Sequence, residues 1–220
     1  MEKVENKIMY HFHKPFVEPD MWQVDNEIVV DNNFKSYFTY NSIYQNPVKK
    51  LHLSNSTDEY DGYFSVADYL LEKATDENLL LLSKNEKDYL EKMKYIKYVL
   101  RESFGIIHRT AISNREQGLE DYRIQNTPEL PSRLHSLWVC TNEQLNYWKK
   151  KLDIESELYV LALTGNLFRT NDSFLPSIYL SREDAKKYAD KYWNPPVERD
   201  EQRDEYLFQG KALILRKVFI

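Results

Sequence analysis

A group of carboxylates close to the carboxyl-terminal strand offers the first candidate for chemistry. Its members are Glu198, Asp200, Glu201, Asp204 and Glu205. Most carboxylates in such a segment belong to a solvated loop. Glu205 differs because it directly precedes the apolar run 206–208 and a strand expected at 212–218. A carboxylate at the start of a strand is held by the sheet and can be aimed at a substrate, so Glu205 is our candidate catalytic residue.

Two of the five histidines, His11 and His13, stand two residues apart on a strand expected at 8–13. Side chains at this spacing point to the same face of a strand. Such a pair could chelate a metal, but the sequence has no H-E-x-x-H motif or other cluster that supplies a third ligand. We therefore favour one structural and one solvent-exposed histidine, and we predict no metal site.

Cys140 is the only cysteine, and it ends the apolar run 137–140 just before a helix expected to begin at Thr141. A helix N-terminus favours a thiolate, which would make Cys140 a candidate nucleophile. A lone cysteine in an apolar run is more often a small core residue, and we prefer that interpretation. A single thiol excludes an intramolecular disulfide and suits a reducing cytoplasm.

Composition excludes several classes of protein. The five glycines are too far apart to form the glycine-rich loop of a dinucleotide-binding fold, a phosphate-binding loop or a G-x-S-x-G nucleophile elbow. The net charge of −5 argues against a general nucleic-acid coat or a membrane-surface protein. The polar stretch 1–10 lacks the apolar pattern of a signal peptide, and no apolar run is long enough to span a bilayer, so we expect neither element. We expect a cytoplasmic protein that does not bind membranes.

The elements that would position these residues follow from apolar patterning and capping signals. Strands are expected at 8–13, 27–30, 136–140, 158–163 and 212–218, and Gly165-Asn166 is typical of a turn. Helices are expected from a capping position at Ser65, from Asn85 to Phe104 with Gly105 as the stop, from Thr141 to Leu152, and from Ser181 onward.

Strands on both sides of a helical stretch, without a regular βαβ repeat, indicate the α+β class. The length of 220 residues and the 42% hydrophobic content suit a single domain spanning residues 1–220. Within it, residues 65–125 are expected to form a helical insertion.

The order of several short motifs resembles a known family. They are Tyr10-His11, Ser132-Arg133 before the run 137–140, Tyr147-Trp148, the run 158–163 leading into Gly165-Asn166, Tyr192-Trp193, and Glu205-x-Leu207-Phe208-x-Gly210. This order resembles an uncharacterised family of bacterial domains seen in Bacillus-like organisms, which is in turn similar to the ADP-ribosyltransferase superfamily. The resemblance covers about residues 8–45 and 130–218.

The resemblance implies a mainly antiparallel core, split or built of two sheets, and a set of site residues. His11 would hydrogen-bond a ribose of NAD, and Trp138 would stack on nicotinamide where those enzymes usually carry tyrosine. Glu205 would stabilise the oxocarbenium-like transition state. Arg133 and Tyr10 would complete the NAD-binding set. Electrostatic stabilisation of this kind requires no metal and no glycine-rich loop.

Three functions follow from this reading. The first is an NAD-dependent ADP-ribosyltransferase or NAD-cleaving enzyme, with NAD as substrate and a protein, nucleic acid or small molecule as the unidentified acceptor. The second is a binding or scaffold protein that keeps the fold without turnover. The third is an RNA-end-processing transferase, against which the negative net charge weighs.

Overall fold

The computed structural model describes residues 1–15, 18–35, 86–152, 157–178 and 180–218. The chain divides into two compact units, one formed by Met1–Tyr44 with Ala111–Ile220 and the other by Gln45–Thr110. The helical insertion expected at 65–125 overlaps both units. Its first part, with the helix start expected at Ser65, lies outside the described residues.

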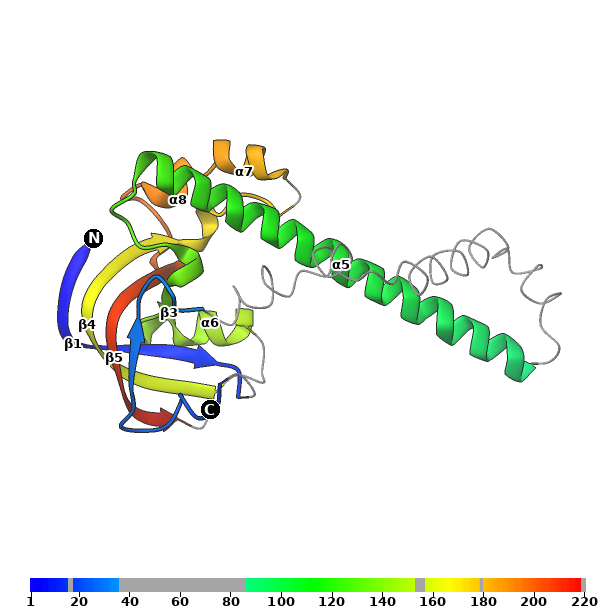
Figure 1. Cartoon of the computed structure of the whole chain (residues 1–220), viewed down its shortest axis with the longest axis horizontal. Coiled ribbons are helices and arrows are strands. Elements are labelled where there is room, and N and C mark those ends of the chain that lie inside the picture. Colours follow the sequence, from blue (N-terminus) through cyan, green and yellow to red (C-terminus); the bar gives the residue numbers. More distant parts are fainter. Residues whose placement is uncertain (16–17, 36–85, 153–156, 179, 219–220) are drawn as a thin grey trace. The chain divides into compact units, whose positions relative to one another are not determined.

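The first unit contains one antiparallel sheet (Figure 1). Its strands are β1 (Glu2–His13), β2 (Glu27–Val30), β3 (Leu137–Val139), β4 (Glu157–Asn171) and β5 (Asp204–Val218). Their order is β1-β4-β5-β2, and β3 pairs with β5 beside β2. The α+β class and the antiparallel pairing are as expected. The split or two-sheet arrangement that we expected is not observed, because the described strands form a single sheet.

This sheet curls until β1 meets the end of β3. The backbone N–H of Tyr10 donates to the carbonyl oxygen of Cys140 at 2.9 Å, and the N–H of Cys140 donates back to Tyr10 at the same distance. Within the sheet, β4 and β5 approach closely where Gly165 lies opposite Gly210. Both glycines have positive φ, 155° and 141°, which side chains rarely tolerate.

The two faces of the curled sheet bury different clusters. Leu137, Leu167 and Phe208 belong to the inner cluster, which contains most of the buried hydrophobic side chains of the described residues. Phe168 and Leu207 belong to the outer cluster, against which Trp138 also packs. Alternation along each strand thus places Trp138 on the outer face.

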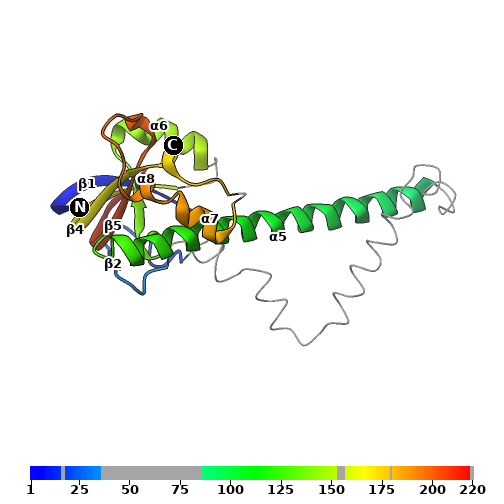
Figure 2. The ribbon, with the colours of Figure 1, turned by 90° about the horizontal axis from the view of Figure 1, so that it is seen from above.

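Helices cover the outer face. They are the carboxyl-terminal part of α5 (Glu86–Asn126), α7 (Arg182–Lys187) and α8 (Asp190–Trp193), while α6 (Leu145–Leu152) lies near β1. Figures 1 and 2 show α7 and α8 beside the carboxyl-terminal part of α5. The contact is close, since Trp193 Nε1 donates to the carbonyl oxygen of Leu119 at 2.9 Å. No described helix is long and apolar enough to cross a membrane.

Two predicted boundaries are wrong. Gly105 does not end its helix, because α5 continues to Asn126 just before the Thr127-Pro128 step. A helical glycine costs only about 1 kcal/mol relative to alanine, and α5 buries Leu119 completely further along. Gly165-Asn166 is not a turn but lies inside β4. The cap at Ser181 is confirmed, since its hydroxyl accepts from the Asp184 N–H at 3.1 Å.

Candidate functional site

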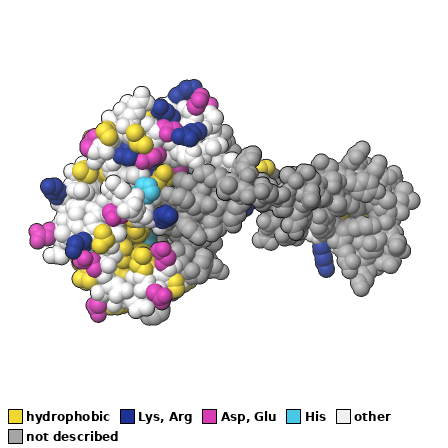
Figure 3. Space-filling view, viewed as in Figure 1, with side chains coloured by type: hydrophobic (Ala, Val, Ile, Leu, Met, Phe, Trp, Pro, Cys, Tyr) yellow, Lys and Arg dark blue, Asp and Glu magenta, His cyan; other side chains and the backbone are white. Residues whose placement is uncertain are grey.

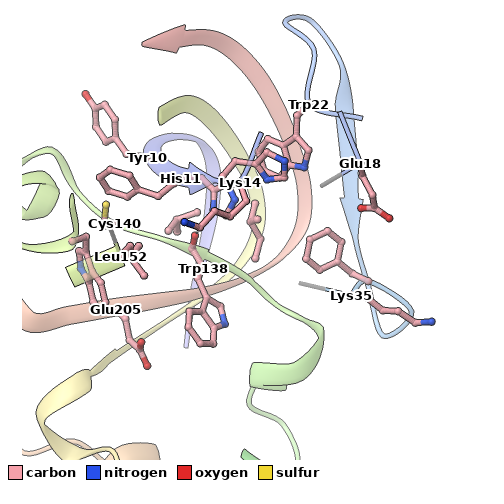
Figure 4. A pocket seen from close by; sticks show the side chains of 16 residues that line it. Tyr10, His11, Lys14, Glu18, Trp22, Lys35, Trp138, Cys140, Leu152 and Glu205 are labelled. Atoms are coloured by element: carbon pink, nitrogen blue, oxygen red, sulfur yellow. The ribbon is translucent and has the colours of Figure 1, made fainter. Parts of the chain in front are cut away.

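A cavity of about 290 Å³ lies where the end of β1 approaches β3. Its lining is mainly aromatic and aliphatic and includes Phe12, Trp22, Phe34, Leu137 and Trp148. Tyr10, His11, Trp138 and Glu205 also line it, so four of the five residues predicted for NAD chemistry border one cavity. Figure 4 shows this arrangement, with His11 near the middle. We call the cavity the His11 pocket.

The protonation of His11 follows from its surroundings. Its Nδ1 lies 2.7 Å from the carbonyl oxygen of Trp138. A carbonyl only accepts, so Nδ1 carries the proton and donates, which leaves Nε2 of the neutral ring as an acceptor. Burial lowers the pKa of His11 to about 3. His11 is therefore a neutral hydrogen-bond acceptor at physiological pH.

Trp22 fixes the orientation of both histidine rings. The Trp22 ring stacks on His11 with centroids 4.6 Å apart and on His13 with centroids 4.2 Å apart. His13 is buried and His11 partly buried, so the expectation that one would be solvent-exposed is wrong. Among the described residues, no group of three or more histidine, cysteine or acidic side chains is placed to hold a metal ion.

Glu205 belongs to a buried ionic network on the outer face. Its Oε1 accepts hydrogen bonds from Nη1 of Arg133 and from the hydroxyl of Tyr192. Arg133 Nε donates to Oε2 of Glu116 on α5 at 2.7 Å, and Arg115 pairs with Oε1 of Glu116 at 2.8 Å. Four charges of alternating sign therefore run from α5 to the first residues of β5.

Electrostatics keep this network charged. Burial alone would raise the pKa of Glu116, but Arg133 and Arg115 outweigh it and hold the pKa below its ordinary value. Burial opposes the charge of Arg133, yet Glu116 and Glu205 raise its pKa well above the ordinary value. The guanidinium carbon of Arg133 also lies 4.5 Å from the Trp138 ring centre and 4.7 Å from that of Tyr192.

This network sets the direction of the Glu205 carboxylate and covers part of the Trp138 ring. We expected the Glu205 carboxylate to face β1 within reach of a ribose held by His11. In Figure 4 the carboxylate is instead turned away from His11. The register agrees, since Glu205 is two residues before Leu207 on the outer face. One face of Trp138 is already covered by Arg133, which leaves less of the ring for a ligand.

The remaining predicted residues have clear places. Arg133 is almost fully buried and does not itself line the His11 pocket, but it contacts Glu205 and Trp138, which do. Tyr10 joins β1 to β3 through its backbone. Burial raises the pKa of Cys140 to about 12, which favours the core interpretation of its thiol over a nucleophile.

Sequence reasoning missed Trp22, Lys14 and Glu116 as parts of the site. Trp22 lies in the segment between two predicted strands, and an aromatic residue there gave no sign of packing on histidines. Glu116 looks like any helical glutamate, because its burial depends on Arg133, seventeen residues later. Tyr192 belonged to the motif order, and its hydroxyl now has a defined partner in Glu205.

Fold and site together define an α+β protein with an aromatic pocket beside a buried ionic network. Residues 9–219 match the family described as "Protein of unknown function (DUF2441)". The chain therefore belongs to the DUF2441 family. That description names no activity, so it does not extend the resemblance to ADP-ribosyltransferases. No curated protein matches the chain.

Proposed function

We propose that this protein binds an NAD-type nucleotide in the His11 pocket. The observation that carries the proposal is the neutral His11 ring, whose Nε2 is an acceptor within an aromatic cavity. A ribose hydroxyl is a suitable donor to that nitrogen, and a planar ring is a suitable neighbour for the aromatic lining. Small-molecule sites commonly combine an apolar lining with a few placed polar groups.

The size of the cavity limits how much of the ligand enters. A volume of about 290 Å³ is at the lower end of the range for ligand pockets. One half of a dinucleotide would therefore occupy the His11 pocket, while the other half lies over the surface. On the face shown in Figure 3, basic and acidic side chains are interspersed, which favours a small ligand over a long polyanion such as RNA.

A second candidate function is glycosyl transfer from NAD. Glu205 lines the His11 pocket, and in the described part of the chain its Oε2 accepts no hydrogen bond. In this reaction the bond between nicotinamide and ribose breaks, and nicotinamide leaves with the bonding electrons. Positive charge develops on the ribose until the acceptor attacks its C1 atom. A carboxylate stabilises that charge, but Arg133 already offsets part of the charge of Glu205.

The two functions are separated by measuring binding and turnover on the same samples. NAD at millimolar concentration should raise the melting temperature of the wild type, and His11→Ala should remove the shift. Nicotinamide release that falls roughly a hundredfold in Glu205→Gln would establish glycosyl transfer. Glu201→Gln is the control, since that side chain is exposed. Asp204 is unsuitable, because it is buried and paired with Arg169 and Arg199 rather than solvated.

Each outcome decides between the candidates. A melting shift without nicotinamide release supports binding alone. Release that is equal in the wild type, Glu205→Gln and Glu201→Gln would remove Glu205 from the chemistry. No melting shift with NAD would contradict both functions.

A further inference from the structure

Lys14 is one of two lysines that line the largely apolar His11 pocket, the other being the exposed Lys35. Lys14 directly follows His13 at the end of β1 and is partly buried. Figure 4 shows its side chain among those that line the pocket together with His11. Within the described residues, the structure gives Lys14 no hydrogen bond and no ion pair, whereas Lys7 and Lys211 each pair with a carboxylate.

A charged ammonium beside apolar surface is costly unless an anion or water accompanies it. The acidic side chains lining the pocket do not serve as that anion. Glu205 is held by Arg133, and Glu18 is exposed and forms no described ion pair with Lys14. The position beside Lys14 is therefore suited to an anionic group supplied by a ligand.

We infer that Lys14 binds a phosphate of the ligand, so that the His11 pocket takes nucleotides in preference to nucleosides or free bases. This inference rests on the proposed function and names its substrate class. His11 and Lys14 are three residues apart and line the same cavity. In a nucleotide the ribose and its phosphate are directly joined, so neighbouring groups that bind each of them form one continuous site.

The pair of ligands that tests this inference is nicotinamide mononucleotide and nicotinamide riboside, which differ only by the phosphate. Their dissociation constants can be measured by quenching of tryptophan fluorescence, because Trp22, Trp138 and Trp148 line the pocket. We expect the full-length wild type to bind the mononucleotide roughly tenfold or more tightly than the riboside, as a charge-assisted hydrogen bond would give. Added salt should weaken only the mononucleotide.

The variants isolate the charge of Lys14. Lys14→Met keeps the apolar stem and should make the two ligands bind equally, whereas Lys14→Arg should restore part of the preference. Lys3→Met, within β1, is the matched control, because Lys3 is exposed and does not line the pocket. Melting temperatures of all variants show whether the fold is intact.

The failure of this inference differs from the failure of the proposed function. Equal binding of both ligands by the wild type, or a preference that persists in Lys14→Met, would overturn the role of Lys14 and leave nucleotide binding standing. Binding of neither ligand, together with no melting shift with NAD, would overturn both.

Discussion

Arg133 is the residue on which the buried charges depend. It contacts Glu116 and Glu205 through different nitrogens, and its flat guanidinium lies against Trp138 and Tyr192. Removing one member of a buried ion network leaves the others desolvated without compensation. The site therefore has two parts. In the network around Arg133 the charges are already paired, whereas in the His11 pocket Nε2 of His11 can still accept a hydrogen bond.

We expect Arg133→Met to lower the free energy of unfolding by about 3–5 kcal/mol, because two buried carboxylates lose their shared cation. Urea unfolding followed by circular dichroism measures the loss. Arg182→Met is the control, since Arg182 is half exposed and its pair with Asp121 is worth about 1 kcal/mol or less. Similar losses in the two variants would show that the network is not a major source of stability.

His11 should give stability a distinct pH dependence. Its pKa falls from 6.5 in the unfolded chain to about 3 in the folded one. Between these values the unfolded state binds more protons, so the free energy of unfolding decreases as the pH falls from 6.5 toward 3. The slope contributed by one such group is at most about 1.4 kcal/mol per pH unit.

His11→Gln should reduce that slope between pH 4 and 6.5, measured by urea unfolding at each pH. The contributions of the carboxylates cancel in the difference between wild type and variant. Parallel pH profiles for the two proteins would show that His11 is not held neutral by the fold.

At the scale of elements, β4 and β5 depend on the facing glycines. A Cβ on Gly210 would lie 2.4 Å from the carbonyl oxygen of Thr164, and one on Gly165 would lie 2.3 Å from that of Gln209. Neither distance is compatible with the present pairing. The close approach lets both long strands bend, and the bend brings the end of β1 to β3.

We expect Gly210→Ala to destabilise the protein by about 1–3 kcal/mol, because it combines an unfavourable backbone conformation with a steric clash. Lys211→Ala, at the next and exposed position of β5, should change stability by roughly 0.5 kcal/mol or less. Chemical denaturation of both variants tests the comparison. An alanine at 210 that leaves stability unchanged would show that the strands can separate locally without cost.

Apolar patterning predicted the places of the strands better than their lengths. The strand expected at 27–30 agrees with β2, and the runs at 158–163 and 212–218 lie inside the much longer β4 and β5. The sequence around Gly165 predicts a turn, because a glycine in a turn and a glycine in a paired bend have the same local sequence pattern. Only its partner Gly210 distinguishes them, and that pairing is a tertiary property.

The same limit applies to the candidate site. His11 and Glu205 could be selected as polar residues on or beside strands, and both border the cavity. The direction of the Glu205 carboxylate could not be predicted from the sequence, because its hydrogen bonds with Arg133 and Tyr192 set it. Patterning also predicted one helix after Ser181, whereas α7 ends before the exposed Tyr188 and α8 begins at Asp190.

At the scale of the whole molecule, the candidate site belongs to one unit. Among the described residues, all that line the His11 pocket and all members of the network around Arg133 lie in Met1–Tyr44 or Ala111–Ile220. Replacing residues 45–110 by a flexible glycine-serine linker should therefore leave a folded protein that still binds NAD. Circular dichroism and the melting shift with NAD measure the outcome. A soluble, folded variant without the shift would mean that the second unit contributes to the ligand site.

The pairing of β1 with β4 also has a consequence for how the protein is made. His13 pairs with Glu157, and roughly 140 residues are synthesised between them, which takes about 7–28 seconds at ribosomal speeds of about 5–20 residues per second. Throughout that interval the nascent β1 lacks β4, the strand with which it pairs in the sheet. An unpaired strand edge is prone to associate with other chains. Slowing translation between β1 and β4 should therefore increase aggregation of the nascent chain, and coexpression with a chaperone that shields strand edges should reverse the effect.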